Sequence, residues 1–144
     1  MLVISACDIH EIEAKCDDAI EKYDKHRFIT DELGSAIDPN DGGMVWYRCS
    51  AGKRFVNYRC EGETLWLSWD EAMAFAEEFS QKSGVIWRLP TRKEMKSIIE
   101  PNCIAPALNR NVFIDAEVSN HWLSDPNTLH QDHFRCTLNS YSGN

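Results

Sequence analysis

No apolar run in this sequence approaches the roughly 20 residues that a membrane-spanning helix requires. Glycine and proline are scarce, at 7 and 5 of 144 residues, so a collagen-like or low-complexity chain is excluded. Basic residues are in the minority, since 15 Lys and Arg oppose 23 Asp and Glu and give a net charge of −8. The predicted partners therefore exclude nucleic acid, and include a membrane only through a lipid anchor.

Recognisable catalytic motifs are missing as well. The sequence has no Gly-x-Ser-x-Gly turn, no phosphate-binding glycine loop and no His-Glu-x-x-His pair. His121, His130 and His133 follow no familiar metal-ligand spacing. We therefore predict that the protein is not an enzyme and has neither a cofactor nor a metal site.

The composition is that of a folded chain, with 43% hydrophobic and 26% charged residues. A chain of 144 residues suits one domain and buries roughly two thirds of its unfolded surface. We expect an N-terminal segment over residues 1–26 and a single domain over 27–144.

Basic residues gather in one stretch of this acidic chain. Residues 44–60 carry four bases and no acid, with aromatic side chains between them. Arginine binds carboxylate or sulfate through two parallel hydrogen bonds, and a neighbouring ring can stack on a sugar. This basic island is the predicted ligand-binding site, unless its charged residues only face solvent on a hairpin. Its members are Arg48, Lys53, Arg54, Arg59 and Tyr58.

Six dispersed cysteines without a Cys-x-x-Cys pair favour disulfides over a zinc site, although six reduced thiols in a cytosolic protein remain the alternative. Cys49 and Cys60 lie near the ends of two short strand patterns with a turn between them, so we predict that they pair across a hairpin. Cys103 and Cys136 are a second candidate pair.

The first seven residues resemble the end of a bacterial lipoprotein signal, because aliphatic residues, Ser5 and Ala6 precede Cys7. Cys7 is therefore a candidate lipidation site, and the predicted location is extracellular or the cell envelope. If the match is accidental, Cys7 could pair with Cys16.

Hydrophobic periodicity and capping signals predict the main elements. An amphipathic helix is expected over residues 9–25, and capping boxes at Ser68 and Thr91 should open two further helices, which end at Gly84 and before Pro101. Strand patterns cover 44–47, 55–58, 112–114 and 121–123.

An ordered set of these motifs resembles a bacterial family, the C-terminal domain of the Legionella collagen-like adhesin (Lcl). The resemblance covers roughly residues 27–126. It implies a C-type-lectin-like α+β fold, with two capped helices on small antiparallel sheets, stapled by disulfides and lacking the family's final strand. The motifs are Arg27–Asp31, Gly43–Trp46, Trp87–Glu94, Pro106–Asn109, Phe113 and Trp122–Ser124.

The resemblance implies a non-enzymatic surface domain that binds a glycan or a surface protein in adhesion, sulfated glycosaminoglycans being one example. The alternative is a structural subunit or tip component of a surface fibre or envelope assembly, with homo-oligomers. A second alternative is an oxidase of the formylglycine-generating type, for which Cys103 and Cys136 would supply the reactive cysteines.

Overall fold

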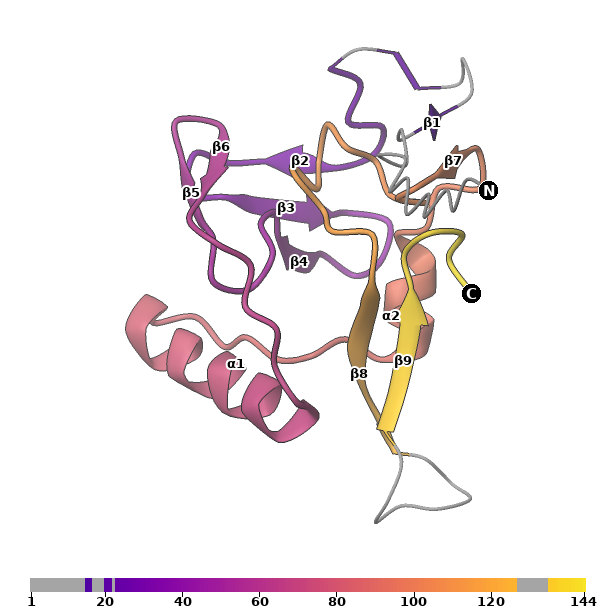
Figure 1. Ribbon diagram of the computed structural model, residues 1–144. Helices are drawn as coiled ribbons and strands as arrows, with labels where there is room; N and C mark the ends of the chain where they lie inside the picture. Colours follow the sequence, from indigo (N-terminus) through magenta and orange to yellow (C-terminus); the bar gives the residue numbers. More distant parts are fainter. Residues whose placement is uncertain (1–14, 17–19, 22, 127–134) are drawn as a thin grey trace, which may run out of the picture.

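Small antiparallel sheets of two or three strands, rather than one large sheet, form the β-structure of the described residues (Figure 1). The computed structural model describes residues 15–16, 20–21, 23–126 and 135–144. The strands are β1 (Lys15–Cys16), β2 (Ile29–Thr30), β3 (Ser35–Asp38), β4 (Met44–Tyr47), β5 (Arg54–Val56), β6 (Arg59–Glu61), β7 (Cys103–Ile104), β8 (Asn120–Pro126) and β9 (Arg135–Asn139), and the helices are α1 (Trp69–Ser83) and α2 (Arg92–Ser97). Neither of these helices has the length and apolarity needed to cross a bilayer.

Both predicted capping boxes are confirmed. The Ser68 side chain accepts a hydrogen bond from the backbone of Glu71, whose carboxylate accepts one from the backbone of Ser68. Thr91 and Glu94 make the same exchange at the start of α2. Gly84 ends α1 in the left-handed conformation, with a φ of 72° that costs glycine little.

The core lies where β3 and β4 meet α2 and the β8–β9 pair. Phe113 occupies its centre and makes edge-on ring contacts with Phe28 at 5.7 Å and Trp46 at 6.2 Å between centroids. The buried members of this cluster are Phe28, Ala36, Met95, Ile98, Leu108, Val112, Phe113, Leu123 and Leu138.

Strand pairing differs from the predicted hairpin between residues 44–47 and 55–58. β4 pairs with β3, and β5 pairs with β6. The second run breaks at Asn57 and Tyr58, whose φ angles of 48° and 63° form a two-residue turn of the kind that suits a tight hairpin. Residues 112–114, also predicted as a strand, form a turn, whereas 121–123 lie within β8.

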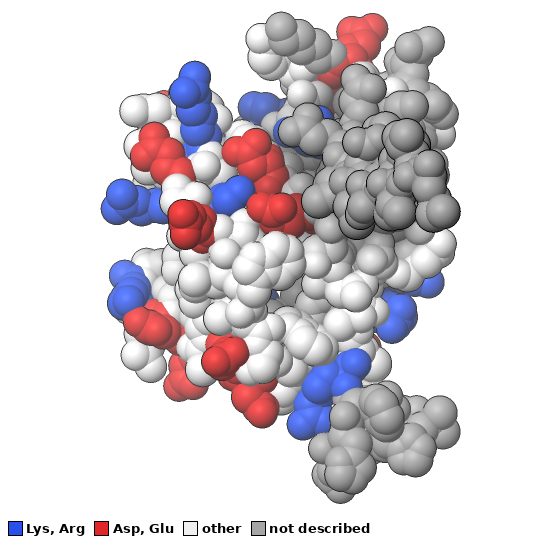
Figure 2. Space-filling model, in the orientation of Figure 1, with Lys and Arg blue, Asp and Glu red and all other residues white. Residues whose placement is uncertain are grey.

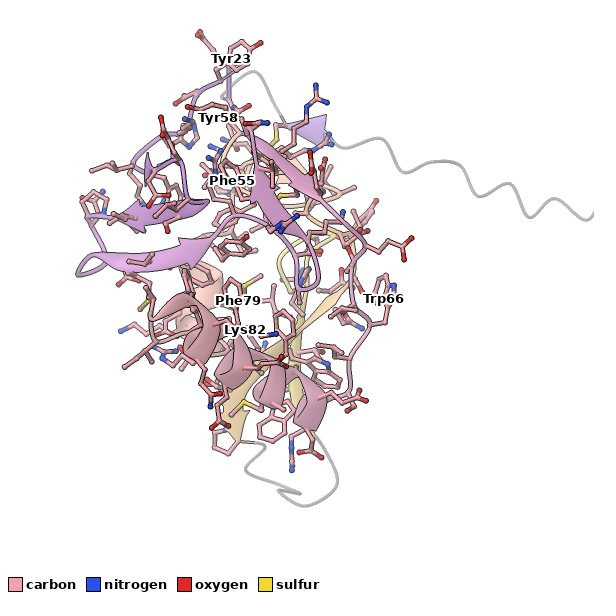
Figure 3. All side chains as sticks on the ribbon, turned by 90° about the vertical axis from the view of Figure 1, so that its left-hand side faces the viewer. Tyr23, Phe55, Tyr58, Trp66, Phe79 and Lys82 are labelled. Carbon is pink, nitrogen blue, oxygen red and sulfur yellow. A yellow bond between two sulfur atoms is a disulfide. The ribbon has the colours of Figure 1, made fainter. Side chains whose placement is uncertain are left out.

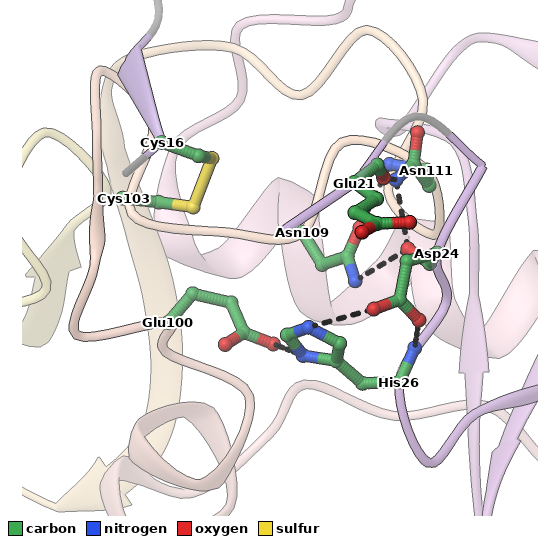
Figure 4. The surroundings of a disulfide bond; sticks show 8 residues. All are labelled: Cys16, Glu21, Asp24, His26, Glu100, Cys103, Asn109 and Asn111. Atoms are coloured by element: carbon green, nitrogen blue, oxygen red, sulfur yellow. Dashed lines mark hydrogen bonds and ion pairs between the residues drawn. A yellow bond between two sulfur atoms is a disulfide. The ribbon is translucent and has the colours of Figure 1, made fainter. Parts of the chain in front are cut away.

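The cysteine predictions are half right. The Cys49–Cys60 disulfide is confirmed, with a Cα–Cα distance of 5.5 Å, although it joins the end of β4 to β6 instead of closing one hairpin. The Cys103–Cys136 pair is wrong, because Cys103 is bonded to Cys16 (Figure 4). The pairing of β1 with β7 sets Cys16 directly opposite Cys103, while Cys136 lies on β9 as a half-buried free thiol.

Hydrogen bonds tie the segment after Cys16 to the domain (Figure 4). Asn109 and Asn111 donate from their side-chain amides to the carbonyl of Asp24 at 3.1 and 2.7 Å. The His26 ring lies 3.2 Å from the carboxylate of Glu100 and 3.3 Å from that of Asp24. These polar contacts help to hold the N-terminal segment against the loop around residue 109.

The helix predicted over residues 9–25 is wrong in its described part, because Lys15–Cys16 is a strand and residues 20, 21 and 23–25 are not helical. Pairing with β7 and the Cys16–Cys103 disulfide outweigh the helical periodicity. Residues 1–14, including Cys7, lie outside the described residues. At the other end, β9 pairs with β8, and the absence of a further family strand stays a prediction.

A buried ion pair connects β3 to α2 and the segment before β2. Asp38 is 1% exposed and accepts a 2.7 Å hydrogen bond from Arg27 Nε, while Arg27 Nη2 donates to the carbonyl of Ser97. The other Asp38 oxygen accepts from the backbone of Asn40 at 3.0 Å. Loss of this carboxylate's charge would leave the guanidinium without a counter-ion.

We expect Asp38→Asn to lower the free energy of unfolding by about 3 kcal/mol, because breaking a largely buried pair leaves one charge uncompensated. Urea denaturation followed by circular dichroism measures the change. Glu78→Gln is the control, since the Glu78–Lys82 pair is exposed on α1 and its loss should leave the midpoint unchanged. Equal midpoints for Asp38→Asn and Glu78→Gln would contradict this account.

Stability should also depend on Glu94 in acid. Two hydrogen bonds from Arg88, at 2.7 and 2.9 Å, and those of the Thr91 capping box lower the pKa of Glu94 from its ordinary 4.5 to about 2. A depressed carboxyl pKa stabilises the folded state above pH 4.5, and this stabilisation disappears as pH falls from 4.5 to about 2.

Melting temperatures measured between pH 2 and pH 6 test this expectation. Glu94→Gln should flatten the acid limb of the curve. Glu71→Gln, the same change at the equivalent position of the other capping box, should flatten it less, because hydrogen bonds from Ser68 alone lower the pKa of Glu71. Superimposable acid limbs for the wild type and Glu94→Gln would refute it.

Candidate ligand-binding cleft

A cleft of about 350 Å³ opens between α1 and the body of the domain. Segments far apart in the sequence form its walls: the end of β4 with the following loop, the loop from Thr64 to Leu67, α1, and the approach to β8. Its volume lies in the range of small-molecule and peptide side-chain sites, roughly 300–1,000 Å³. Figure 3 faces this side, with Phe79 on α1 and Trp66 at the edge of the molecule.

One face of α1 forms the helical wall. Ala72, Phe75, Ala76 and Phe79 recur at helical spacing and all line the cleft. Phe75 and Phe79 stack with parallel rings 6.0 Å apart.

Aromatic contacts hold α1 against β4. The Phe79 ring lies 5.1 Å from that of Tyr47 and 5.7 Å from that of Trp87, and Tyr47 and Trp87 are themselves 5.8 Å apart. Tyr47 and Trp87 also line the cleft. This cluster of three rings closes one side of the cleft.

Two tryptophans fix the start of α1 and the loop before it to β8. Trp69 Nε1 donates to the carbonyl of Leu123 at 3.0 Å, and Trp122 Nε1 donates to the carbonyl of Leu67 at 2.7 Å. Trp66, three residues before Trp69 in the chain, is 72% exposed although it lines the cleft. An exposed indole beside an aromatic cleft is available to a ligand.

Polar groups form part of the rim. The Glu117 carboxylate accepts from Thr64 Oγ1 at 2.9 Å and lies 3.4 Å from Lys53 Nζ. Burial lowers the pKa of His121 below its usual value of 6.5, so the ring is neutral at pH 7, and it lies 3.2 Å from the Glu117 carbonyl. These side chains can fix the orientation of a ligand through hydrogen bonds.

Arg48, predicted as a ligand-binding member of the basic island, is only 3% exposed. Its Nε donates to the carbonyl of Val112 at 2.9 Å, its Nη2 donates to that of Asn111 at 3.1 Å, and the guanidinium lies 4.7 Å from the centre of the Phe55 ring. Burial lowers the pKa of Arg48, and the negative charge of Asp31 offsets part of this shift by raising the pKa. Arg48 lines the cleft from within the domain instead of facing solvent.

The other four residues of the basic island lie in two separate places. Lys53 lies at the cleft, paired with Glu117. Arg54, Tyr58 and Arg59 are exposed on the β5–β6 hairpin, where Arg54 lies opposite Glu61. Figure 2 shows basic and acidic side chains interspersed on one face, rather than a continuous basic area. The five predicted residues therefore do not form one site.

The residues that sequence reasoning missed are aromatic: Phe75, Trp66, Trp87 and Trp122 line the cleft. Within the described part of the chain, no group of three or more His, Cys, Asp or Glu residues is arranged to hold a metal ion.

Comparison with known protein families gives a match over most of the chain. The family model of the Lcl C-terminal domain matches residues 35–144 of the chain. No curated protein and no solved structure matches the chain significantly, so the C-type-lectin-like fold stays a prediction. The match covers well over half of the chain and extends the resemblance carried by the Met44–Trp46 and Trp87–Thr91 motifs to residue 144. The chain therefore belongs to the Lcl C-terminal domain family.

Proposed function

We propose that this protein is a non-enzymatic surface recognition domain that acts in adhesion and binds a glycan or a segment of a surface protein. The cleft between α1 and the domain body is the observation that carries the proposal, because it combines aromatic walls with a polar rim. Membership of the Lcl C-terminal domain family supports an adhesin-like, surface-associated role.

The chemistry of the cleft suits recognition better than catalysis. Rings such as Phe75 and Trp66 offer apolar faces to a sugar or a side chain, and Glu117 and Lys53 offer one acceptor and one donor. An oxidase of the formylglycine-generating type requires two reactive cysteines, and Cys103 is already bonded to Cys16. The recognition role therefore has more support than the enzymatic alternative.

The disulfides support an extracellular or envelope location. Cys16–Cys103 joins residues 87 positions apart, and Cys49–Cys60 joins residues 11 apart. Such bonds persist in oxidising compartments and are rare in the cytosol. An adhesive role requires that location.

Trp66→Ala should weaken binding of the protein to a surface ligand at least tenfold, because it removes an exposed ring from the cleft at little cost to the fold. A glycan array and binding to immobilised surface proteins would identify the ligand, and titration would give the affinity.

Ile86→Ala is the matched control, because Ile86 is 91% exposed and does not line the cleft. Its affinity should equal that of the wild type. The cleft is excluded if Trp66→Ala binds as well as Ile86→Ala, and a loss confined to Arg54→Gln/Arg59→Gln would move the site to the hairpin.

A second candidate function, a subunit of a surface assembly, rests on the outer face of the β2–β3–β4 sheet. Ile29, Ile37 and Val45 are directly cross-paired there. Ile29 is 59% exposed and Val45 41% exposed. A row of apolar residues across three strands suits contact with another chain.

If that row mediates self-assembly, analytical ultracentrifugation should find oligomers of the wild type at micromolar concentration. Ile29→Glu should dissociate them, whereas Leu33→Glu, at an exposed site in the turn between β2 and β3, should not. A monomer at every concentration would remove this candidate.

A further inference from the structure

We propose that the cleft binds the C-terminal end of a partner protein whose last residue is aromatic, with its carboxylate at Arg48 and Trp46 and its ring among those of the wall. The inference rests on the proposed function and names the ligand class of the same site.

Two unpartnered donors mark the cleft. Among the described residues, the buried side-chain nitrogen and oxygen atoms without a hydrogen-bond partner are Trp46 Nε1 and Arg48 Nη1. Both side chains line the cleft. A buried donor left without an acceptor costs roughly 1–3 kcal/mol, and more when it is charged. Two such donors on residues that line one cleft, just behind its open space, indicate a place for an acceptor that comes from outside the chain.

The charge of Arg48 specifies that acceptor further. Its other hydrogen bonds go to the neutral carbonyls of Asn111 and Val112, and none of the ion pairs among the described residues includes it. The negative charge of Asp31 acts on this guanidinium from a distance, but a buried guanidinium without a carboxylate in direct contact is unfavourable. A carboxylate supplies both the missing acceptor and the missing charge, and its bonds to a guanidinium are among the strongest that proteins make.

The surrounding walls select the rest of the ligand. Tyr47, Phe79 and Trp87 form a ring cluster at one side of the cleft, and Phe75 continues it along α1. A further aromatic ring gains contact area there, in the edge-on or offset geometries that rings prefer. The ligand therefore combines an aromatic ring and a carboxylate within about 350 Å³.

A chain end fits these limits better than an internal acidic residue or a sugar. The last residue of a protein carries its carboxylate and its side chain on one carbon atom, and only one chain segment has to leave the cleft. A neutral sugar could stack on these rings but would supply no negative charge for Arg48.

Entry requires a small movement, because Trp46 Nε1 and Arg48 Nη1 are closed off from solvent. Ring contacts at Phe79 and the indole bond of Trp69 hold α1 to the body. These aromatic side chains can move apart without breaking any backbone hydrogen bond between strands. We therefore expect ligand entry to change the environment of the tryptophans that line the cleft.

N-acetyl-phenylalanine is the probe, and N-acetyl-phenylalanine amide is its matched control without the charge. Titrations of the intact protein, followed by ¹H–¹⁵N NMR, should show saturable binding of the acid in the cleft and at least tenfold weaker binding of the amide. Equal affinity for acid and amide would overturn the proposal.

Trp46→Phe removes the unpartnered indole N–H and keeps an aromatic ring, so it should weaken binding of the acid at least threefold. Ile86→Ala is the control, because Ile86 is 91% exposed and does not line the cleft. It should bind the acid as the wild type does. Arg48→Lys should weaken binding more, and Trp46→Phe keeps the test valid if Arg48→Lys does not fold.

Competition experiments separate this inference from the proposed function. Displacement of the acid by heparin, or by a neutral oligosaccharide that binds in the cleft more tightly, would make the ligand a glycan and overturn the inference alone. Equal binding of inorganic sulfate would reduce the site to an oxyanion site and also overturn it. If the acid, glycans and surface proteins all fail to bind, both proposals fail.

Discussion

The Arg48 guanidinium is the interaction on which the arrangement around the cleft depends. It extends from the end of β4, lies over the Phe55 ring of the β5–β6 hairpin and donates to the carbonyls of Asn111 and Val112, more than 60 residues away. The adjacent Cys49–Cys60 disulfide links the same strand to the same hairpin. The end of β4, the β5–β6 hairpin and the loop at residues 111–112 belong to no common sheet, and the buried charge of Arg48 holds them together. Its contacts take the place of the backbone pairing that joins segments in larger sheets.

In the contacts described, side chains rather than strand pairing attach α1 to the rest of the domain. Indole hydrogen bonds from Trp69 and Trp122 hold its start, and the rings of Tyr47, Phe79 and Trp87 hold its far half. The cleft is the space that remains between these rings and the body of the domain. The site is therefore a consequence of how the helix is attached, and the unpartnered donors give it chemical selectivity.

The features that could be predicted from the sequence are local ones. The capping boxes at Ser68 and Thr91 each lie within four residues, and the Cys49–Cys60 pair spans only 11, so short patterns were sufficient. Pairing of β4 with β3, and of Cys16 with Cys103 across 87 residues, depends on tertiary contacts that no local pattern contains. The basic island was divided for the same reason, since the burial of Arg48 is decided by the distant loop at Val112. The motifs predicted the family, which the match over residues 35–144 confirms, but they did not indicate the cleft.

The indole ¹H–¹⁵N resonance of Trp46 gives the most direct test that the cleft is a ligand site with a free donor. In the unliganded protein, the account predicts an indole proton at the chemical shift of an N–H without a hydrogen bond, distinct from those of Trp69 and Trp122, which donate to carbonyls. Addition of N-acetyl-phenylalanine should move this resonance toward the hydrogen-bonded position. A Trp46 resonance that is already hydrogen-bonded, or that does not move while residues of the β5–β6 hairpin do, would contradict the account.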